Sequence, residues 1–405
     1  MHRWQDVAAA TGLVGSDGAV RPTIFAEMSA LAARTGAVNL GQGFPDVDGP
    51  EHVARAAIRA IRQGRNQYPP GGGEPELRRA LAGHQERYYG LRPDPMSEVL
   101  VTTGATEAIA ATVLALVDPG DEVITLEPYY DSYAAVLAMA GARHVTVGLL
   151  AEGGGFRLDR AGLAAAVTGR TRMILLNSPH NPTGTVLDRA ELEAVAAVAR
   201  EHDLLVVTDE VYEHLTFDGV VHVPVATLPG MAERTLSISS AGKTLSFTGW
   251  KVGWVTGPAD LVAAVRTVQQ FLTYVSGAPF QVAVAQALAD RDGRTGEYVR
   301  GLASSLAARR DLLCTGLTSA GFDVVVPQGT YFVVADGAPL GYLDGVDLCR
   351  RLPALAGVVG VPVGAFCRAG SPTARALASR VRFTFVKREE VLREAVGRLR
   401  ALTRG

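Results

Sequence analysis

The chain has 405 residues, of which 48% are hydrophobic and 20% are charged. This length allows a large core and favours two domains over one. The formal net charge of -2 provides no basic surplus to neutralise phosphates, which argues against a dedicated binder of nucleic acid or of acidic membrane surfaces.

The cysteines and the first residues bear on the cellular compartment of the protein. Cys314, Cys349 and Cys367 are far apart and lack metal-ligand spacing, so we expect a reduced, cytoplasmic protein and no bound metal. The first residues lead into an alanine run too short for the core of a signal peptide, and no long apolar segment occurs elsewhere. We therefore expect small-molecule chemistry and no membrane partner.

The N-terminal region changes character near residue 22. The residues before it mix Gly, Ala, Asp and Ser without a clear period and predict a loose arm. The apolar residues Ile24, Met28 and Leu31 return at helical spacing and predict an amphipathic helix over residues 24–34. The next loop, residues 39–46, contains Gly41 and Gly43, which allow the backbone to approach a ligand or form a plain turn.

Short β-rich runs alternate with helical stretches over the next part of the chain. Several runs are apolar on both faces, as buried parallel strands are, and they predict an α/β domain with a mostly parallel seven-stranded sheet. The expected strands are residues 99–102, 123–126, 144–147, 173–176, 204–208, 235–238 and 253–256, with a helix over 190–200.

The alternation weakens from about residue 285. A helical region over 298–320 leads to expected strands at 323–326, 331–335 and 381–386, which suits a smaller α+β domain. We therefore predict an N-terminal arm and part of the small domain over 1–48, a large domain over 49–285 and a small C-terminal domain over 286–405.

Residues able to do chemistry follow the predicted strands. In α/β sheets ligands bind beyond the carboxyl ends of the strands, so one crevice can collect these residues. They are Gly104, Ala105 and Thr106 after the first strand, Tyr130 after the second, Asn181 after the fourth, Asp209 after the fifth and Lys243 after the sixth.

Lys243 lies among small residues, with Ser239 and Ser240 before it and Lys251 eight positions later. A lysine amine attacks an aldehyde when desolvation or a nearby cation lowers its pKa, and pyridoxal phosphate (PLP) is the commonest aldehyde held in this way. The alternative is a surface loop with solvated lysines.

Two motifs upstream of Lys243 support the first interpretation. They are Asn181-Pro182-Thr183-Gly184 and Asp209-Glu210-Val211-Tyr212. Together with the lysine segment they resemble fold-type I, class I aminotransferases, and the similarity extends from about residue 39 to 388. The resemblance implies a PLP enzyme that moves an amino group from an amino-acid donor to a 2-oxo-acid acceptor by a ping-pong mechanism.

The resemblance also implies roles around the cofactor ring. Lys243 would anchor the aldehyde and shuttle a proton, and Asp209 would keep the ring nitrogen protonated. Tyr212 and Asn181 would bond the phenolic oxygen, and Tyr130 would stack on the ring. Asp209 could instead cap a helix, and Tyr130 could be a core residue.

The cofactor phosphate would lie at a helix start. Gly104, Ala105 and Thr106 fall between a strand and a helix whose first amides can face an anion, and Ser240 and Lys251 would complete the site. Tyr68 matches a tyrosine that reaches the neighbouring subunit's cofactor phosphate, which implies a homodimer with shared active sites.

Substrate recognition would depend on Arg382, which alternates with apolar residues of a predicted strand. A carboxylate suits the planar, bidentate geometry of arginine, although a structural salt bridge is the alternative. Gly43 would lie in the loop that closes over the substrate, and Asn181 would also contact the substrate. We place the side-chain pocket near Phe25, Gly43 and residues 274–277, which offer no second arginine, and we expect poor turnover of aspartate.

Two other functions are alternatives to an aminotransferase. A carbon-sulfur β-lyase would use the same residues. A regulator with an aminotransferase-like domain would need a DNA-binding module, for which the N-terminal arm is too short and insufficiently basic. Residues 24–28, 39–46, 68–70, 127–133 and 270–280 resemble N-succinyldiaminopimelate aminotransferases and the related methionine, glutamine and kynurenine aminotransferases.

Overall fold

The structure is a computed structural model that describes residues 3–15 and 17–404. Met1, His2 and Ser16 of the predicted arm and Gly405 of the predicted C-terminal domain lie outside the described residues. Among the described residues, no helix combines the length and the apolar character that crossing a bilayer requires.

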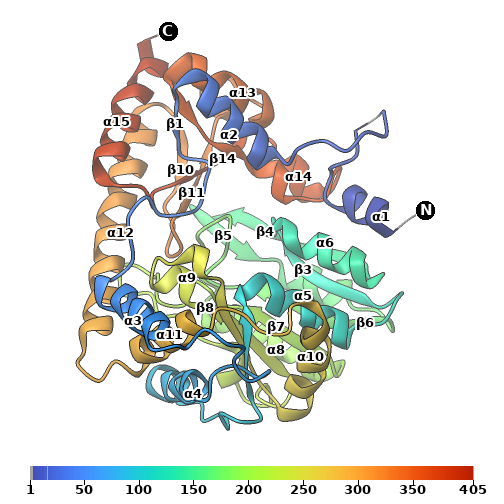
Figure 1. The fold of residues 1–405 in the computed structure, drawn as a ribbon. Coiled ribbons are helices and arrows are strands. Elements are labelled where there is room, and N and C mark those ends of the chain that lie inside the picture. Colours follow the sequence, from blue (N-terminus) through green and yellow to red (C-terminus); the bar gives the residue numbers. More distant parts are fainter. Residues whose placement is uncertain (1–2, 16, 405) are drawn as a thin grey trace.

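The molecule has two parts, a larger and a smaller layer, each built around its own sheet (Figure 1). An eight-stranded sheet forms the centre of the larger layer, in the order β2-β9-β8-β7-β6-β3-β4-β5. The five strands from β8 to β4 are parallel, whereas β9 runs antiparallel to both of its neighbours. The strands are β2 (Val99–Thr103), β3 (Glu122–Glu127), β4 (Arg143–Glu152), β5 (Gly155–Leu158), β6 (Thr171–Asn177), β7 (Leu205–Asp209), β8 (Thr235–Ser240) and β9 (Val252–Thr256).

All seven predicted strands of this sheet are present, and β5 is an eighth. Strand β5 was not predicted, because its 4 residues are too few to show an alternation. It forms an antiparallel hairpin with β4 and buries Phe156 and Leu158.

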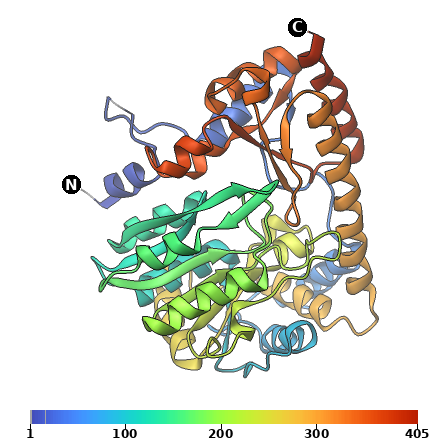
Figure 2. The same ribbon diagram turned by 180° about the vertical axis from the view of Figure 1, so that it is seen from behind.

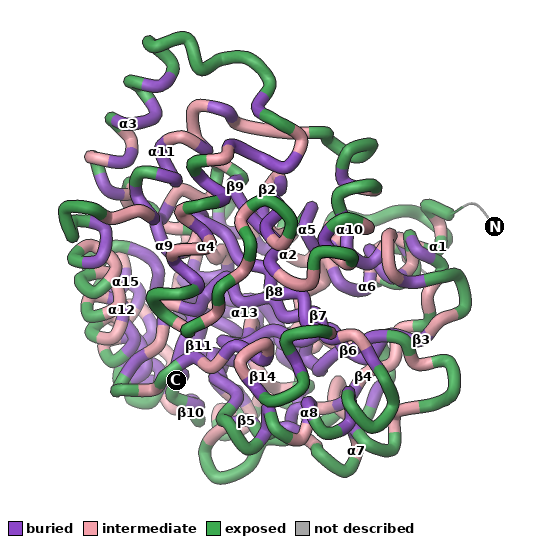
Figure 3. Tube along the Cα trace, turned by 90° about the horizontal axis from the view of Figure 1, so that it is seen from below, coloured by how far each residue is buried: buried purple, intermediate pink, exposed green. Residues whose placement is uncertain are grey.

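Alternate residues of the central strands enter cores on opposite faces of the sheet. Met173 and Leu175 of β6 pack on one face, and Ile174 and Leu176 pack on the other. Helices therefore cover both faces, and the strands are buried between them (Figure 3). The helices of this layer are α3 (Glu51–Arg62), α4 (Pro75–Tyr89), α5 (Gly104–Leu116), α6 (Asp131–Ala140), α7 (Arg160–Ala166), α8 (Arg189–Glu201), α9 (Ala241–Thr244), α10 (Ala259–Leu272) and α11 (Ala278–Ala289), with η1 (Val225–Thr227) and η2 (Thr248–Trp250).

A second layer contains a four-stranded antiparallel sheet in the order β10-β11-β14-β13. The long helix α12 runs along one side of the molecule in both views (Figures 1 and 2). The elements are α12 (Arg294–Ser319), β10 (Asp323–Val325), β11 (Phe332–Asp336), η3 (Ala338–Leu340), α13 (Gly345–Ala356), β12 (Val358–Val359), β13 (Val361–Pro362), η4 (Val363–Phe366), α14 (Pro372–Ala376), β14 (Arg380–Thr384), α15 (Glu389–Leu399) and η5 (Arg400–Arg404).

The N-terminal segment joins this second layer. Helix α2 (Ile24–Thr35) packs against α13, and β1 (Val38–Asn39) pairs in parallel with β12. The prediction of a loose arm is wrong for its first part, because α1 (Arg3–Ala10) is helical and packs against α6. A helix this short depends on tertiary packing, which the sequence pattern does not show. The domain boundaries stay a prediction.

Candidate active site

A cavity of about 470 Å³ lies where the parallel strands of the large sheet end. This volume is typical of small-molecule sites. Every predicted site residue except Tyr68 lines this cavity. The predicted residues that line it are Gly43, Gly104, Ala105, Thr106, Tyr130, Asn181, Asp209, Tyr212, Ser240, Lys243, Lys251 and Arg382.

Lys243 enters the cavity from α9, directly after β8. Its Nζ atom donates a hydrogen bond to the hydroxyl oxygen of Tyr331, 2.9 Å away, and lies 5.8 Å from the centre of the Tyr212 ring. The hydroxyl of Tyr331 donates in turn to the carbonyl oxygen of Gly43, at 2.6 Å. The amine is therefore held in place by a phenol rather than by a carboxylate.

Asp209 ends β7 and faces the same cavity. Its Oδ2 atom accepts a hydrogen bond from the hydroxyl of Tyr133 at 2.7 Å. Burial raises the pKa of Asp209 to about 6, although this hydrogen bond and the nearby Lys243 favour the charged form. A cation placed beside this carboxylate would recover part of the cost of its burial.

The junction between β2 and α5 forms the base of the candidate phosphate site. Gly104 has a φ of +74°, and a Cβ atom built there would lie 3.3 Å from Nζ of Lys251. Nζ of Lys251 donates to the hydroxyl oxygen of Thr106 at 3.4 Å, and Ser240 lines the same end of the cavity. Burial lowers the pKa of Lys251, with a further contribution from Lys243. A bound dianion would offset both effects.

Arg382 is buried on β14 among three aromatic rings. Its guanidinium carbon lies 4.0 Å from the ring centre of Phe332 and 4.6 Å from that of Phe366. Nη1 donates to the side-chain oxygen of Asn181 and Nη2 donates to the carbonyl oxygen of Gly41, both at 2.9 Å.

The charge of this guanidinium is not balanced by a close carboxylate. Among the described residues, no ion pair includes Arg382, and its Nε atom has no hydrogen-bond partner. Burial lowers the pKa of Arg382 to about 10. The predicted alternative, a structural salt bridge, is therefore not what the described residues form, and the guanidinium is suited to an external carboxylate.

Gly43 lies against the aromatic wall of the cavity. A Cβ atom at this position would lie 2.4 Å from Cζ of Phe332, so a larger residue would displace the ring or the loop. Phe25 also lines the cavity, as predicted for the side-chain pocket. Residues 274–277, the other predicted part of that pocket, do not line the cavity of this chain.

Tyr68 is not in the cavity of its own chain. Its side chain is 81% exposed, and its ring contacts that of Tyr274 at a centroid distance of 5.6 Å. The role of Tyr68 in a partner subunit stays a prediction.

Three residues of the cavity region, Tyr331, Tyr133 and Asp131, were not predicted from the sequence as site residues. Tyr133 lies three positions after Tyr130, a helical spacing that could have indicated a shared face. Asp131 lines the cavity at the start of α6. Tyr331 was placed only in a predicted strand, and its contact with Lys243 spans 88 positions of sequence, for which no local signal exists.

The cavity residues fit PLP. An amine, a buried carboxylate and a cationic site at a helix start occur together, and these correspond to the aldehyde, the ring nitrogen and the phosphate of the cofactor. A Cβ atom at Gly104 would crowd the end of the Lys251 side chain, so the glycine keeps this part of the cavity open. Asn181 and Tyr212 lie between these groups and Arg382, where a phenolic oxygen and a substrate carboxylate would need donors.

Comparison with known proteins gives consistent matches over nearly the whole chain. The sequence profile of the family described as aminotransferase class I and II matches residues 35–399. A probable N-succinyldiaminopimelate aminotransferase from Mycobacterium tuberculosis is 56% identical over 384 residues, which cover 94% of this chain and 96% of the relative. Methionine aminotransferase from Escherichia coli is 40% identical over 380 residues, with coverage of 94% and 96%. The solved structure of N-succinyldiaminopimelate aminotransferase from Mycobacterium tuberculosis has a TM-score of 0.90 and 55% identity, and the match covers 94% of this chain and 97% of that one.

Proposed function

The chain belongs to the aminotransferase class I and II family, and from this premise we propose that it transfers the amino group of N-succinyl-LL-diaminopimelate to 2-oxoglutarate. The chain is a PLP-dependent aminotransferase with the type I fold of these enzymes. The donor and acceptor are the proposal, supported by the 56% identity to the probable N-succinyldiaminopimelate aminotransferase. Methionine and glutamine are the second candidate donors, and the 40% identity to methionine aminotransferase supports the first of them.

The observation that carries this choice of donor is the charge of the cavity wall. Among the described lining residues the cations are Lys243, Lys251 and Arg382, and the first two face the cofactor groups. One guanidinium therefore remains for substrate carboxylates, and the Asp131 carboxylate would repel a second carboxylate held close to the first. The donor N-succinyl-LL-diaminopimelate and the acceptor 2-oxoglutarate are longer than aspartate, so each can place its distal carboxylate farther from Asp131.

The chain's own residues supply binding and proton transfer. When bound, PLP supplies an aldehyde for the amino group and a ring that withdraws electrons from the substrate Cα. Nζ of Lys243 would hold the aldehyde and then take the Cα proton as a base. The carboxylate of Asp209 would keep the ring nitrogen protonated, and Tyr130 would cover the ring face.

Other residues would position the two ends of the site. Thr106, Ser240 and Lys251, with the first amides of α5, would hold the phosphate. Arg382 would bind the α-carboxylate of the donor and, after product release, that of the 2-oxo acid. Because one guanidinium serves both substrates, they must occupy one site in turn, which is the basis of a ping-pong mechanism.

We also propose a homodimer in which Tyr68 completes the partner's phosphate site, because Tyr68 is exposed and does not line its own cavity. A cytoplasmic location is proposed from the three free thiols, Cys314, Cys349 and Cys367.

The similar proteins are aminotransferases, so the β-lyase alternative has no support from them, and the chain is an enzyme rather than a regulator.

The donor proposal is tested by half-reactions of the PLP form. Each donor is mixed with enzyme without acceptor, and conversion to the pyridoxamine form is followed by absorbance. N-Succinyl-LL-diaminopimelate should give the largest kcat/KM, followed by methionine or glutamine, with aspartate last. Aspartate as the best donor would contradict the proposal, and pyruvate release from cystathionine without any oxo acid would restore the lyase.

A further inference from the structure

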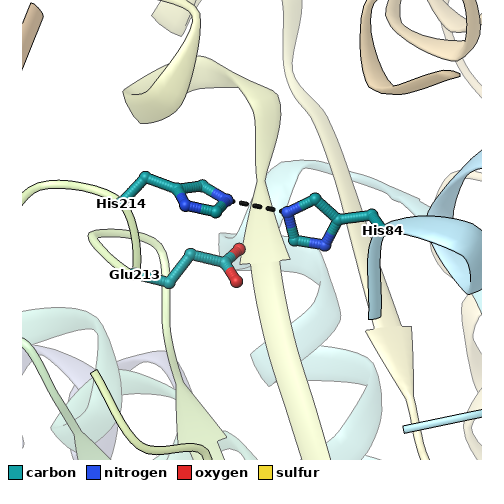
Figure 4. Close-up of side chains that lie close together, drawn as sticks. All are labelled: His84, Glu213 and His214. Carbon is teal, nitrogen blue, oxygen red and sulfur yellow. Dashed lines mark hydrogen bonds between the residues drawn. The ribbon is translucent and has the colours of Figure 1, made fainter. Parts of the chain in front are cut away.

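Two histidines and a glutamate that do not line the cofactor cavity lie close together (Figure 4). His84 lies in α4, whereas Glu213 and His214 lie in the turn after β7. One ligating atom from each residue lies within 4.8 Å of the others. His84 and Glu213 are buried, and His214 is partly exposed.

The two imidazoles face each other through the same ring atoms. The Nε2 atoms of His84 and His214 are 2.7 Å apart, so in the absence of an ion one ring must donate a hydrogen bond to the other. Nδ1 of His84 is buried and has no hydrogen-bond partner. The contact therefore leaves His84 with a buried ring nitrogen unpaired whichever ring donates.

The carboxylate of Glu213 is oriented by two hydroxyl groups. Tyr89 donates to Oε2 at 2.5 Å and Ser239 donates to Oε1 at 2.6 Å. Each oxygen accepts one hydrogen bond and retains a lone pair. Outer hydrogen bonds of this kind hold a ligating carboxylate in one orientation.

The surroundings of the three groups agree with this geometry. Burial lowers the pKa of His84 to about 4 and also lowers that of His214. Burial disfavours the charged form of Glu213, but the two histidines and the hydroxyl donors lower the pKa of its carboxyl.

We propose that His84, Glu213 and His214 bind a divalent transition-metal ion, Zn²⁺ in the first instance, at a site separate from the cofactor cavity. Two imidazoles and one carboxylate are a zinc ligand set that leaves a fourth position for water, and His214 is partly exposed. Ligand bonds of about 2.0–2.1 Å place two nitrogens of a tetrahedral site about 3.3 Å apart, so the rings must separate by a little over half an ångström.

The position of the ion gives it a structural role. It would join α4 to the turn after β7, and Glu213 directly follows Tyr212 of the cofactor cavity. Ser239, which orients Glu213, directly precedes Ser240 of the candidate phosphate site. The ion would therefore stabilise the wall behind the cofactor without contacting the substrate.

The test uses the PLP-loaded enzyme, freed of metal with a chelator and dialysed against Zn²⁺ or Co²⁺. We expect one ion per chain, a visible Co²⁺ absorption of the intensity that four- or five-coordinate sites give, and a rise in Tm of about 3 °C when free Zn²⁺ exceeds its Kd a hundredfold. Substoichiometric metal, or Co²⁺ with only the weak absorption of its hydrated ion, would overturn the proposal on the wild-type enzyme alone.

Variants locate the ion. His214→Gln removes a partly exposed ligand and should weaken binding by more than about tenfold, which would at least halve the Tm shift at the same free Zn²⁺. Glu213→Gln keeps one acceptor oxygen for the hydroxyl groups but loses the charge and should also weaken binding. The matched control is His202→Gln, which removes an exposed histidine at the end of α8 and should bind as the wild type does. Unchanged binding in His214→Gln and Glu213→Gln would place the ion elsewhere and overturn the proposal.

Discussion

Nη1 of Arg382 donates a hydrogen bond to the side-chain oxygen of Asn181 over 2.9 Å, which joins β14 of one sheet to the loop after β6 of the other. With its oxygen directed at the guanidinium, Asn181 has its amide NH₂ group left as a donor. The pair therefore couples the proposed carboxylate site to the proposed site of the cofactor's phenolic oxygen. A change in the guanidinium should affect substrate binding first.

Arg382→Lys should lower kcat/KM for every α-amino acid. Lysine keeps the charge but loses the planar pair of donors, and loss of a charge-assisted bidentate contact of about 2–3 kcal/mol corresponds to about 100-fold. PLP content, measured by absorbance, should not change. Arg350→Lys is the control, because Arg350 is exposed and pairs with Glu27. Equal effects of the two variants would contradict a substrate role for Arg382.

Lys243 should be the residue that holds the cofactor. The chain contains three lysines, Lys243, Lys251 and Lys387, so a borohydride-reduced pyridoxyl group has few lysines to mark. Peptide mass spectrometry should find it on Lys243. Lys243→Ala should lose about 10³-fold or more in kcat, the scale of a missing acid-base and covalent group. Lys387→Arg should retain turnover, and a label on Lys251 or Lys387 would refute the assignment.

Some site residues could be predicted from the sequence and others could not, for physical reasons that differ. Strands such as β6 were predictable because both faces are apolar, and Asn181, Asp209 and Lys243 follow such strands. The sheet then brings their ends together. Tyr331 was not predictable, because it meets Lys243 through contact between two layers.

The contact between His84 and His214 could not be predicted for the same reason. His84 and His214 are 130 positions apart, so no spacing rule could join them, and the expectation of no metal came from the cysteines. Helix α1 was not predicted, because its formation depends on packing against α6.

Asp209→Asn should stabilise the PLP-free protein at high pH. The folded pKa of Asp209 is about 6 against an ordinary value of 3.8, so the ionised, buried carboxylate costs up to about 3 kcal/mol above pH 6. Because the folded pKa is raised, this cost is absent below pH 3.8, grows between pH 3.8 and pH 6 and stays constant above pH 6. Calorimetry should therefore show a higher Tm for the variant at pH 8 and a smaller difference at pH 5. A less stable variant at pH 8 would contradict the prediction, and turnover should be lost in either case.

Tyr68 should act in the partner subunit's site. Lys243→Ala and Tyr68→Phe subunits, each impaired alone, should form mixed dimers in which one site carries both changes and the other carries neither. Activity should therefore rise above both parents after co-refolding or co-expression. If mixed dimers form by mass spectrometry and activity does not rise, the sites are not shared through Tyr68.

Asp131 should set the preference against short dicarboxylate donors. Its side chain lines the cavity, it interacts electrostatically with Arg382, and burial raises its pKa although that arginine opposes the rise. A donor such as aspartate would bring a second carboxylate into this region with no further cation beside it. Asp131→Asn removes the repulsion and keeps the shape of the side chain, so kcat/KM for aspartate should rise about fivefold relative to methionine.

The ratio of the two donors is the informative quantity in this experiment, because a general disturbance of α6 would lower both rates together. Asp118→Asn is the control, since Asp118 is exposed at the other end of the same layer, before β3. If the ratio for Asp131→Asn equals that of the control, Asp131 does not discriminate between donors. The poor fit of aspartate would then have to come from the aromatic wall formed by Phe25, Phe332 and Phe366, and widening that wall with Phe25→Leu should change the methionine rate more than the aspartate rate.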